Sequence, residues 1–494
     1  MSSQPTVDLY SVLGVPFYAS QDDLQRAYRE AAKRFHPDVN KAPSAAQEFK
    51  AVTDAFQLLN DATQRQRYDE ELANSPLLEP VFRIEQLPSR QALSIMTEPQ
   101  VVYMLLSVYP SQATAHQKGT PPLNICLVVD RSTSMRERRL DQVKSAARQI
   151  IDSLQPQDTF AVVSFSDRAQ VVIPATRNIN KAMAINRIAA IQAGGGTEIL
   201  QGLMYGLAEV HRNLNPGAIN HVVLLTDGHT YGDEAECYQL ATRAELDGIT
   251  ISGLGIGAGW NDEFLDELTG ITGGKTTYTS SSKMVTRHLR EHVLGLGDTF
   301  AERMRLSVVT DPGVELQEAF RLRPTPQPVD VKNQPLRLGS LDRRSQLSVM
   351  LRFLVPAQPK RKEQLPLARL RLTGDVISLG RIGEVALSDF IMRLEDIEMR
   401  TLTTPPRPII DALEKINLYQ MQLRVSSEAG AGNVEGAIGQ LQVLASRLMA
   451  QGQQQLAEAA LSEVNNLKSR RQLSEEGKKE LKYGTRALLL AAPR

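Results

Sequence analysis

The sequence predicts a multidomain protein with an all-α N-terminal unit, a β-sandwich interrupted by an α/β domain, and a helical C-terminal region. Three observations predict this. The 494 residues exceed the length of one typical domain, apolar residues recur at helical spacing near both ends, and strand and helix patterns alternate through the middle. The expected boundaries are 1–72 for the N-terminal unit, 73–120 plus 299–404 for the sandwich, 121–298 for the α/β domain and 405–494 for the C-terminal region.

Composition describes an ordinary globular chain and excludes some function classes. Hydrophobic residues make up 42% and charged residues 23% of the sequence, and 56 basic residues balance 56 acidic ones. This balance gives no electrostatic case for binding nucleic acid or a membrane surface. A single Trp and an aromatic content of 5% also argue against a base-stacking platform.

The sequence carries no sign of export or membrane insertion. Cys126 and Cys237 are the only cysteines, too few for a disulfide framework or a Cys-rich zinc site. Residues 1–5 contain neither the basic nor the apolar segment of a secretory signal. No stretch reaches the ~18 apolar residues of a membrane helix. We therefore expect a cytoplasmic protein.

The N-terminal unit has the pattern of a helical hairpin. Apolar residues recur at helical spacing over Leu24–Phe35 and again over Phe49–Leu59. Between them lies His36-Pro37-Asp38, and Pro37 disfavours helical conformation at the residue before it. The two helices should bury their apolar faces against each other and leave the loop exposed. Opposite that face, Arg26, Arg29 and Lys33 form a basic stripe.

Residues 6–70 resemble a DnaJ-type J-domain. The matching segments, in order, are Asp8-Leu9-Tyr10, Leu13-Gly14-Val15, the helix Leu24–Phe35, His36-Pro37-Asp38 and Arg67-Tyr68-Asp69. The resemblance implies that the loop and the basic helix dock on a DnaK-type heat-shock chaperone and stimulate its ATP hydrolysis. The implied chaperone-binding residues are Arg26, Arg29, Lys33, Arg34, His36, Pro37 and Asp38. The alternative is a loop turn beside a solvated charged face. Because no Gly/Phe-rich linker or zinc-binding repeats follow, client choice must come from elsewhere in the chain.

Strand patterns flank the central domain on both sides. Val81–Ile84 and Val101–Val108 precede it, while Leu347–Phe353 and Ala368–Leu372 follow it, the last with clean alternation of apolar and basic residues. Prolines punctuate the segments between them. We expect residues 78–115 to pair with residues 300–400 in one β-sandwich.

The central insertion alternates strands and helices, as a doubly wound α/β domain does. The expected strands are Leu123–Val129, Phe160–Phe165, Ala169–Ile173, Val222–Leu225 and Ile249–Leu254, and the expected helices lie near 138–154, 180–192, 199–213, 233–246, 262–269 and 283–295.

Oxygen-bearing side chains follow the buried strands of this domain. The first strand ends in Asp130, with Ser132 and Ser134 at alternate positions after it. Thr197 follows three glycines, and Asp227 follows another buried strand. Carboxyl ends of parallel strands are where α/β folds place their sites, and hard cations prefer oxygen ligands. Taken alone, Asp130–Ser134 could equally be a turn and helix cap.

The combination of these motifs over residues 121–298 resembles the von Willebrand factor A-type fold with a metal-ion-dependent adhesion site. The resemblance implies Ser132, Ser134 and Thr197 as hydroxyl ligands, with Asp130 and Asp227 holding the ion directly or through water. We expect the cation to be Mg²⁺, with Mn²⁺ or Ca²⁺ as alternatives. Two carboxylates roughly neutralise a dication, so a partner's Asp or Glu can complete its shell.

Two further segments leave alternatives open. His288-Leu289-Arg290-Glu291-His292 matches a zinc-peptidase pattern, but it falls on a helix whose apolar face should close the domain, so we expect ordinary helix surface and no enzyme. Residues 405–494 have helical spacing after a proline-rich breaker. They should pack against the sandwich or form a partner-binding array.

The combined prediction is a J-domain co-chaperone. It would stimulate a DnaK-type ATPase and bind a protein partner or client, through an acidic side chain, at the metal site. The alternative is a scaffold or assembly subunit that docks on a larger complex, such as a ring ATPase, through that site. A zinc peptidase at His288 and His292 is a distant third.

Overall fold

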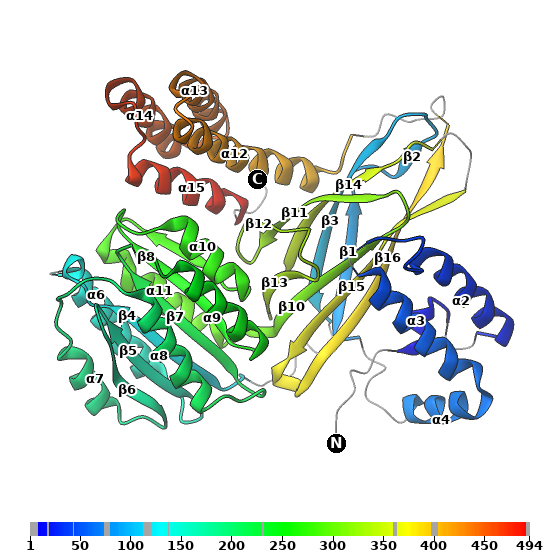
Figure 1. The fold of residues 1–494 in the computed structure, drawn as a ribbon, viewed down its shortest axis with the longest axis horizontal. Helices are drawn as coiled ribbons and strands as arrows, with labels where there is room; N and C mark the ends of the chain where they lie inside the picture. The colour runs from blue at the N-terminus through cyan, green and yellow to red at the C-terminus, as the bar shows by residue number, and fades with distance from the viewer. Residues whose placement is uncertain are drawn as a thin grey trace. The chain divides into compact units, whose positions relative to one another are not determined.

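The computed structural model describes residues 8–16, 19–42, 44–73, 80–111, 120–136, 138–229, 232–358, 363–396 and 404–490. The chain divides into two compact units (Figure 1). One unit comprises residues 1–118 and 300–411, and the other comprises residues 119–299 and 412–494. The predicted fold class is confirmed: a helical N-terminal domain, a sandwich interrupted by an α/β domain, and C-terminal helices.

The N-terminal domain is a helical hairpin with short helices at each end. Its helices are α1 (Leu9–Leu13), α2 (Gln21–Phe35), α3 (Ala45–Asn60) and α4 (Ala62–Ala73). Ser20 and Asp23 form a reciprocal capping box that fixes the start of α2. The helix ends before Pro37, as predicted, since His36 has extended geometry with φ −59° and ψ 130°. Leu24, Phe35 and other apolar side chains of α2 and α3 are fully buried between the helices.

Two five-stranded sheets form the β-sandwich. One has the order β1 (Phe82–Pro88), β3 (Gln100–Pro110), β14 (Leu347–Val355), β11 (Glu315–Arg323), β12 (Gln327–Val329); the other has the order β13 (Leu336–Asp342), β10 (Thr299–Thr310), β15 (Gln364–Val376), β16 (Arg381–Glu395), β2 (Ala92–Ser94). Strands β3 and β14 pair antiparallel from Val108↔Leu347 to Gln100↔Val355. This pairing confirms that strands on either side of the α/β insertion belong to one sandwich.

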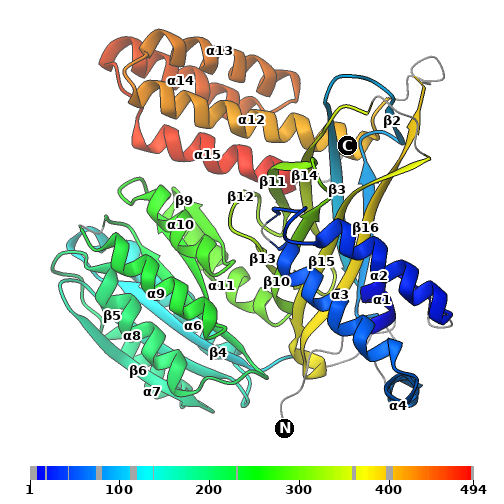
Figure 2. The same cartoon turned by 45° about the vertical axis from the view of Figure 1, so that its right-hand side comes forward.

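Helices α2 and α3 lie beside β15 and β16 of the sandwich (Figure 2). The contact centres on Arg369 of β15, whose side chain is 5% exposed. Its guanidinium holds both carboxylate oxygens of Asp389 at 3.0 Å and donates to the Val12 carbonyl at 2.8 Å. Glu48 of α3, 2% exposed, lies between Arg369 and Arg371 at 3.6 and 2.7 Å. Buried ion pairs therefore fix the helical domain to the sandwich.

Substitution Arg369→Ala should lower the free energy of unfolding of this unit by about 3 kcal/mol, because it removes the cation shared by the buried Glu48 and the partly buried Asp389, which keep Arg371 and Arg34 as partners. Urea unfolding of the full chain, followed by circular dichroism, measures the change. Arg83→Ala is the matched control, since Arg83 is 54% exposed and pairs with Glu85, which is 50% exposed, and it should cost less than about 1 kcal/mol. Equal losses in both variants would contradict the role given to the buried cluster.

The α/β domain has one six-stranded sheet. The strands are β4 (Leu123–Asp130), β5 (Thr159–Phe165), β6 (Ala169–Arg177), β7 (Ile219–Thr226), β8 (Thr250–Ile256) and β9 (Thr276–Thr279), in the order β6-β5-β4-β7-β8-β9. The helices are α6 (Arg138–Ser153), α7 (Lys181–Ala189), α8 (Ile199–Arg212), α9 (Glu234–Leu246), α10 (Asp262–Ile271) and α11 (Ser282–Leu296). All pairings are parallel except that of β6 with β5. Every residue of the central strands β4, β5 and β7 is buried, which explains their near-continuous apolar sequences.

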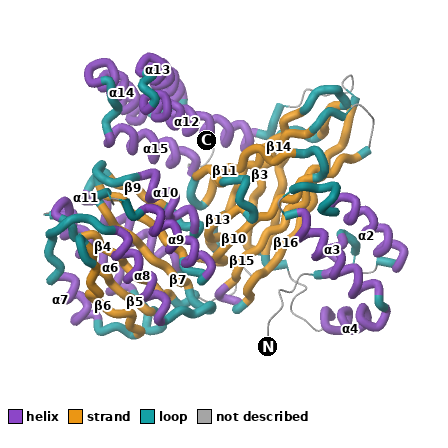
Figure 3. The backbone as a smooth tube through the Cα atoms, viewed as in Figure 1, coloured by secondary structure: helices purple, strands orange, loops and turns teal. Residues whose placement is uncertain are grey.

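From residue 404 to 490 the chain forms helices and turns (Figure 3). These are α12 (Arg407–Gly430), α13 (Val434–Ala450), α14 (Gln454–Arg470) and α15 (Glu475–Leu490). The expectation that this region packs against the sandwich is wrong for α15, whose Lys482 and Arg486 form ion pairs with Asp266 of α10. Among the described helices, none combines the length and the apolar character needed to span a membrane.

Candidate functional site

The oxygen-bearing side chains predicted as ligands gather where β4 and β7 end. Asp130 is the last residue of β4, and Asp227 directly follows Thr226, the last residue of β7. These two strands are neighbours in the parallel sheet, so their carboxyl ends adjoin. Asp130 is 0% and Ser132 and Asp227 are each 2% exposed. The position matches the prediction that the site lies at the strand ends.

Hydrogen bonds connect these oxygens into one cluster. Asp130 accepts from the Ser132 backbone amide and from the Thr226 hydroxyl, each at 2.8 Å. The Ser132 and Ser134 hydroxyl oxygens lie 2.9 Å apart. Ser134 in turn donates to Asp227 Oδ1 at 2.6 Å. Four of the five predicted ligands are thus linked in a continuous chain.

Thr197 reaches the same place from the loop before α8. A Cβ at Gly228, next to Asp227, would lie 2.9 Å from Thr197 Oγ1, so a larger residue at 228 would displace the hydroxyl. Residues 194–196, the three glycines before Thr197, are also hydrogen-bonded to the segment that follows β4. Thr133 donates through its amide and hydroxyl to the Gly195 carbonyl at 3.0 and 2.9 Å. The structure therefore brings all five predicted ligands to one edge of the sheet.

The spacing and charge of this cluster fit a divalent cation. Neighbouring ligands around Mg²⁺ at about 2.1 Å lie about 3.0 Å apart, close to the oxygen separations within the cluster. Burial raises the pKa of Asp130 to about 6, hydrogen bonds from Ser132 and Thr226 oppose the rise, and the Asp227 charge adds to it. Two carboxylates held together away from water are stabilised by a cation between them.

Sequence reasoning missed two side chains of this site. Thr226 is the hydroxyl partner of Asp130, and its place in Thr226-Asp227-Gly228 is a signal that could have indicated it. Arg139 of α6 lies 2.5 Å from Asp227 Oδ2 and 3.4 Å from the Ser134 carbonyl oxygen. No sequence signal indicates this role, because Arg139 is one of several arginines at the start of α6.

The His36-Pro37-Asp38 loop is open to solvent. The side chains of His36 and Asp38 are 44% and 86% exposed. His36 Nδ1 accepts from the Asp38 amide at 3.2 Å, and its ring meets the Phe49 ring edge-on at 5.0 Å between centroids. A partner protein can therefore reach the loop without rearrangement of the helices around it.

The basic residues of α2 separate into two groups. Arg26, Arg29 and Lys33 are exposed, as predicted. Arg34 is 19% exposed and binds Asp311 through two hydrogen bonds of 2.8 Å. The structure thus places Arg34 in the contact with the sandwich, apart from the exposed basic face.

The expectation that His288 and His292 lie on ordinary helix surface is wrong for His292, which contacts the buried His221 of β7, whereas His288 is partly covered. His292 Nε2 lies 3.4 Å from Nε2 of His221 on β7, which also lies 3.0 Å from the Ser252 hydroxyl. The Nδ1 atoms of His221, His288 and His292 are buried and have no hydrogen-bond partner. Within the described residues, no three His, Cys, Asp or Glu side chains are grouped as metal ligands. His221 is buried on β7 and His292 of α11 packs against it, with 5.3 Å between the ring centroids, while His288 is only partly buried.

These buried histidines should make the α/β domain sensitive to acid. Burial lowers the pKa of His221 to about 3 and that of His292 well below 6.5, and the charge of Lys275 adds to both effects. These histidines take up protons near pH 6.5 in the unfolded chain but stay neutral in the folded chain. The free energy of unfolding is therefore fully present above pH 6.5 and decreases as the pH is lowered below that value. The expected loss at pH 5 is about 2 kcal/mol per histidine.

Urea unfolding of the full chain at pH 7.5 and 5.0 measures this loss. His221→Leu should reduce the difference between the two pH values. His211→Gln, at a side chain that is 59% exposed, should leave it unchanged. The same pH difference in His221→Leu as in the unaltered chain would contradict the assignment to the buried histidines.

Three family models match successive parts of the chain. Residues 8–69 match the DnaJ domain, residues 124–292 the von Willebrand factor type A domain, and residues 407–491 the Sll0103-like C-terminal alpha-helical domain. The chain is 31% identical over 249 residues to the uncharacterized protein sll0103 of Synechocystis sp.. It is 54% identical over 63 residues to the chaperone protein DnaJ of Levilactobacillus brevis.

These relatives are matched over only part of their lengths. The alignment with sll0103 covers 48% of this chain and 59% of that protein, and the alignment with DnaJ covers 13% and 16%. Among solved structures, a von Willebrand factor type A protein from Catenulispora acidiphila is similar over 82% of this chain and 96% of that one, with TM-score 0.64 and 17% identity. The ArnB paralog VWA2 from Sulfolobus acidocaldarius is similar over 83% and 100%, with TM-score 0.52 and 14% identity. The two structures show a shared fold.

Proposed function

We propose that this chain, in which an N-terminal DnaJ domain is fused to a von Willebrand factor type A domain, is a co-chaperone that captures a protein through a divalent cation and stimulates a DnaK-type ATPase. The observation that supports this is the coexistence of two sites in one chain. One is the exposed His36-Pro37-Asp38 loop, and the other is the oxygen cluster at the ends of β4 and β7. We propose no catalytic residue at either site.

The chaperone half of the proposal rests on the loop and the basic face beside it. Arg26, Arg29 and Lys33 are exposed on α2, where three positive charges attract an acidic partner surface and speed its association. The loop residues His36 and Asp38 are exposed at the end of the same helix. We assign the docking of the ATPase to this face. Arg34 lies outside it and contributes by holding α2 on the sandwich through Asp311.

The capture half rests on the oxygen cluster. The residues that would hold the cation are Asp130, Ser132, Ser134, Thr197 and Asp227. When bound, the cation supplies an electrophilic centre for an oxygen of an acidic side chain from the partner. The residues of the chain orient this centre: Thr226 fixes the Asp130 carboxylate, and Ser134 fixes that of Asp227. We propose Mg²⁺ as the ion, with Mn²⁺ or Ca²⁺ as alternatives.

A scaffold or assembly subunit is the second candidate. The observation that favours it is the rigid attachment of the DnaJ domain, which buried ion pairs of Arg369 and Arg34 hold against the sandwich. A DnaJ domain that is packed on the sandwich, rather than joined to it by a free linker, suits a subunit of a larger complex. The DnaJ domain would then serve only the assembly of that complex.

The hydrolysis rate of a purified bacterial DnaK, measured with and without the full chain, tests the proposal. We expect the chain to increase the rate and to associate with DnaK transiently in an ATP-sensitive manner. An unchanged rate, combined with stable stoichiometric co-purification of the chain with another complex, would contradict the co-chaperone and support the scaffold.

A further inference from the structure

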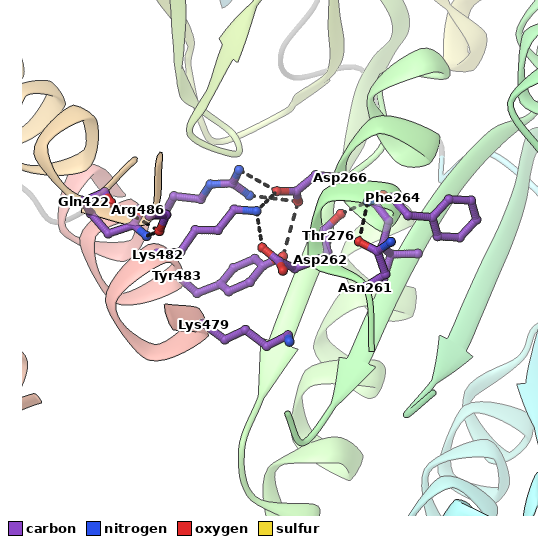
Figure 4. A network of polar contacts seen from close by, with 12 residues as sticks. Asn261, Asp262, Phe264, Asp266, Thr276, Gln422, Lys479, Lys482, Tyr483 and Arg486 are labelled. Atoms are coloured by element: carbon purple, nitrogen blue, oxygen red, sulfur yellow. Dashed lines mark hydrogen bonds and ion pairs between the residues drawn. The ribbon is translucent and has the colours of Figure 1, made fainter. Parts of the chain in front are cut away.

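Helix α15 is joined to the α/β domain by a buried network of charges (Figure 4). Arg486 donates to both oxygens of Asp266 at 2.9 and 2.7 Å, and Lys482 pairs with Asp262 and Asp266. The side chains of Lys482 and Arg486 are each 9% exposed. Burial acts to raise the pKa of Asp266, but the charges of Arg486 and Lys482 outweigh it and lower that pKa. The contact is therefore ionised and well paired.

Lys479 of the same helix contacts a different element, the loop between β8 and α10. We call residues 257–261 the edge loop. The Lys479 side chain is 0% exposed, and its ammonium donates to the Ala258 carbonyl at 2.7 Å and lies 5.3 Å from the centre of the Trp260 ring. Burial of an ammonium is costly unless its hydrogen bonds are made. The bond to Ala258 is thus a specific attachment of α15 to the edge loop.

The other side of the edge loop contacts the oxygen cluster. A Cβ at Gly259 would lie 3.0 Å from the Asp227 carbonyl oxygen, and a Cβ at Gly257 would lie 3.0 Å from the Arg139 guanidinium that pairs with Asp227. Within the loop, Trp260 Nε1 donates to the Gly257 carbonyl at 2.8 Å. The edge loop therefore lies between Asp227 and α15 and touches both.

We propose that Lys479 is a positioning residue for the cation site, so that the C-terminal helix controls cation affinity without contributing a ligand. This inference rests on the proposed function. The edge loop contains two glycines and gains conformational freedom when its attachment is removed. With the loop released, Asp227 and Arg139 lose the surface that packs against them. Loss of a hydrogen bond made directly to a metal ligand typically weakens metal binding by about 10–100-fold, and release of the edge loop, one contact further out, should act at the low end of that range.

Trp260 makes the inference directly testable, because it is the only tryptophan of the chain and lies in the edge loop. Mg²⁺ is titrated into the full chain while heat release and tryptophan emission are recorded. We expect Mg²⁺ to change the Trp260 emission of the unaltered chain. In Lys479→Met the dissociation constant should rise about tenfold. Lys479→Arg, which keeps a donor, should recover part of the affinity.

Lys478→Met is the matched control, because Lys478 is 38% exposed and pairs with Glu475 on the same helix. It should bind Mg²⁺ as the unaltered chain does. A folded Lys479→Met chain with unchanged affinity would overturn the inference while leaving the proposed function intact. The inference would also be overturned if the unaltered chain binds Mg²⁺ without a change in Trp260 emission. That result does not depend on whether the variant folds. Absence of Mg²⁺ binding to the unaltered chain would refute the proposed function and this inference together.

Discussion

Substitution His36→Gln is expected to reduce the stimulated ATPase rate of DnaK to that of DnaK alone. The imidazole accepts the Asp38 amide through Nδ1 and packs edge-on against Phe49, so it shapes the exposed loop. Gln fits the backbone geometry of position 36 but has no ring for Phe49. The loop thus loses its defined conformation while the helices on either side keep their core.

Single-turnover ATP hydrolysis by DnaK, with the full chain in excess, measures this effect. His211→Gln is the matched control, because it removes a histidine that is 59% exposed on α8, far along the sequence from the loop. It should stimulate DnaK as the unaltered chain does. Unchanged stimulation by His36→Gln would refute the co-chaperone role.

Sequence periodicity predicted most of the fold because burial on one face leaves a regular pattern. The α2 segment has its apolar residues at helical spacing, and the central strand β4 is buried over its whole length, which its apolar run indicates. Strand β9 was missed, since Thr276–Thr279 is short and has little apolar character. Its pairing with β8, rather than its own sequence, makes it a strand.

The candidate cation site could be predicted because its parts follow strands, and parallel strands bring their carboxyl ends together. The spacing from Asp130 to Ser134 is local, and Thr197 and Asp227 each follow a recognisable element. Arg139 could not be predicted, since its contact with Asp227 depends on how α6 starts after the turn.

Contacts between distant segments also could not be predicted. Helical spacing places Arg34 on a polar face, but its partner Asp311 lies 277 positions away in the sequence. Likewise, nothing in the helix containing Lys479 indicates Ala258 as its neighbour, 221 positions earlier. Periodicity shows which side of a helix is buried. Only the tertiary fold determines which residues of other segments that side contacts.

Substitution Asp130→Ala is expected to abolish Mg²⁺ binding. Asp130 is fully buried and holds the Ser132 amide and the Thr226 hydroxyl, so alanine removes one of the two carboxylates and the contacts that orient its neighbours. Asp130→Asn keeps the shape of the side chain and removes only the charge. It should also lose most of the affinity, because a neutral amide offsets the charge of a dication poorly.

Isothermal titration of Mg²⁺ into the full chain tests the central claim most directly. Asp152→Asn, an exposed carboxylate on α6, serves as the control, and a pull-down with and without Mg²⁺ follows partner capture by the same proteins. We predict that the unaltered chain and Asp152→Asn bind one Mg²⁺ per chain and capture partner only in its presence, while Asp130→Ala does neither. Capture that is independent of Mg²⁺ and unaffected by Asp130→Ala would contradict the cation-dependent mechanism.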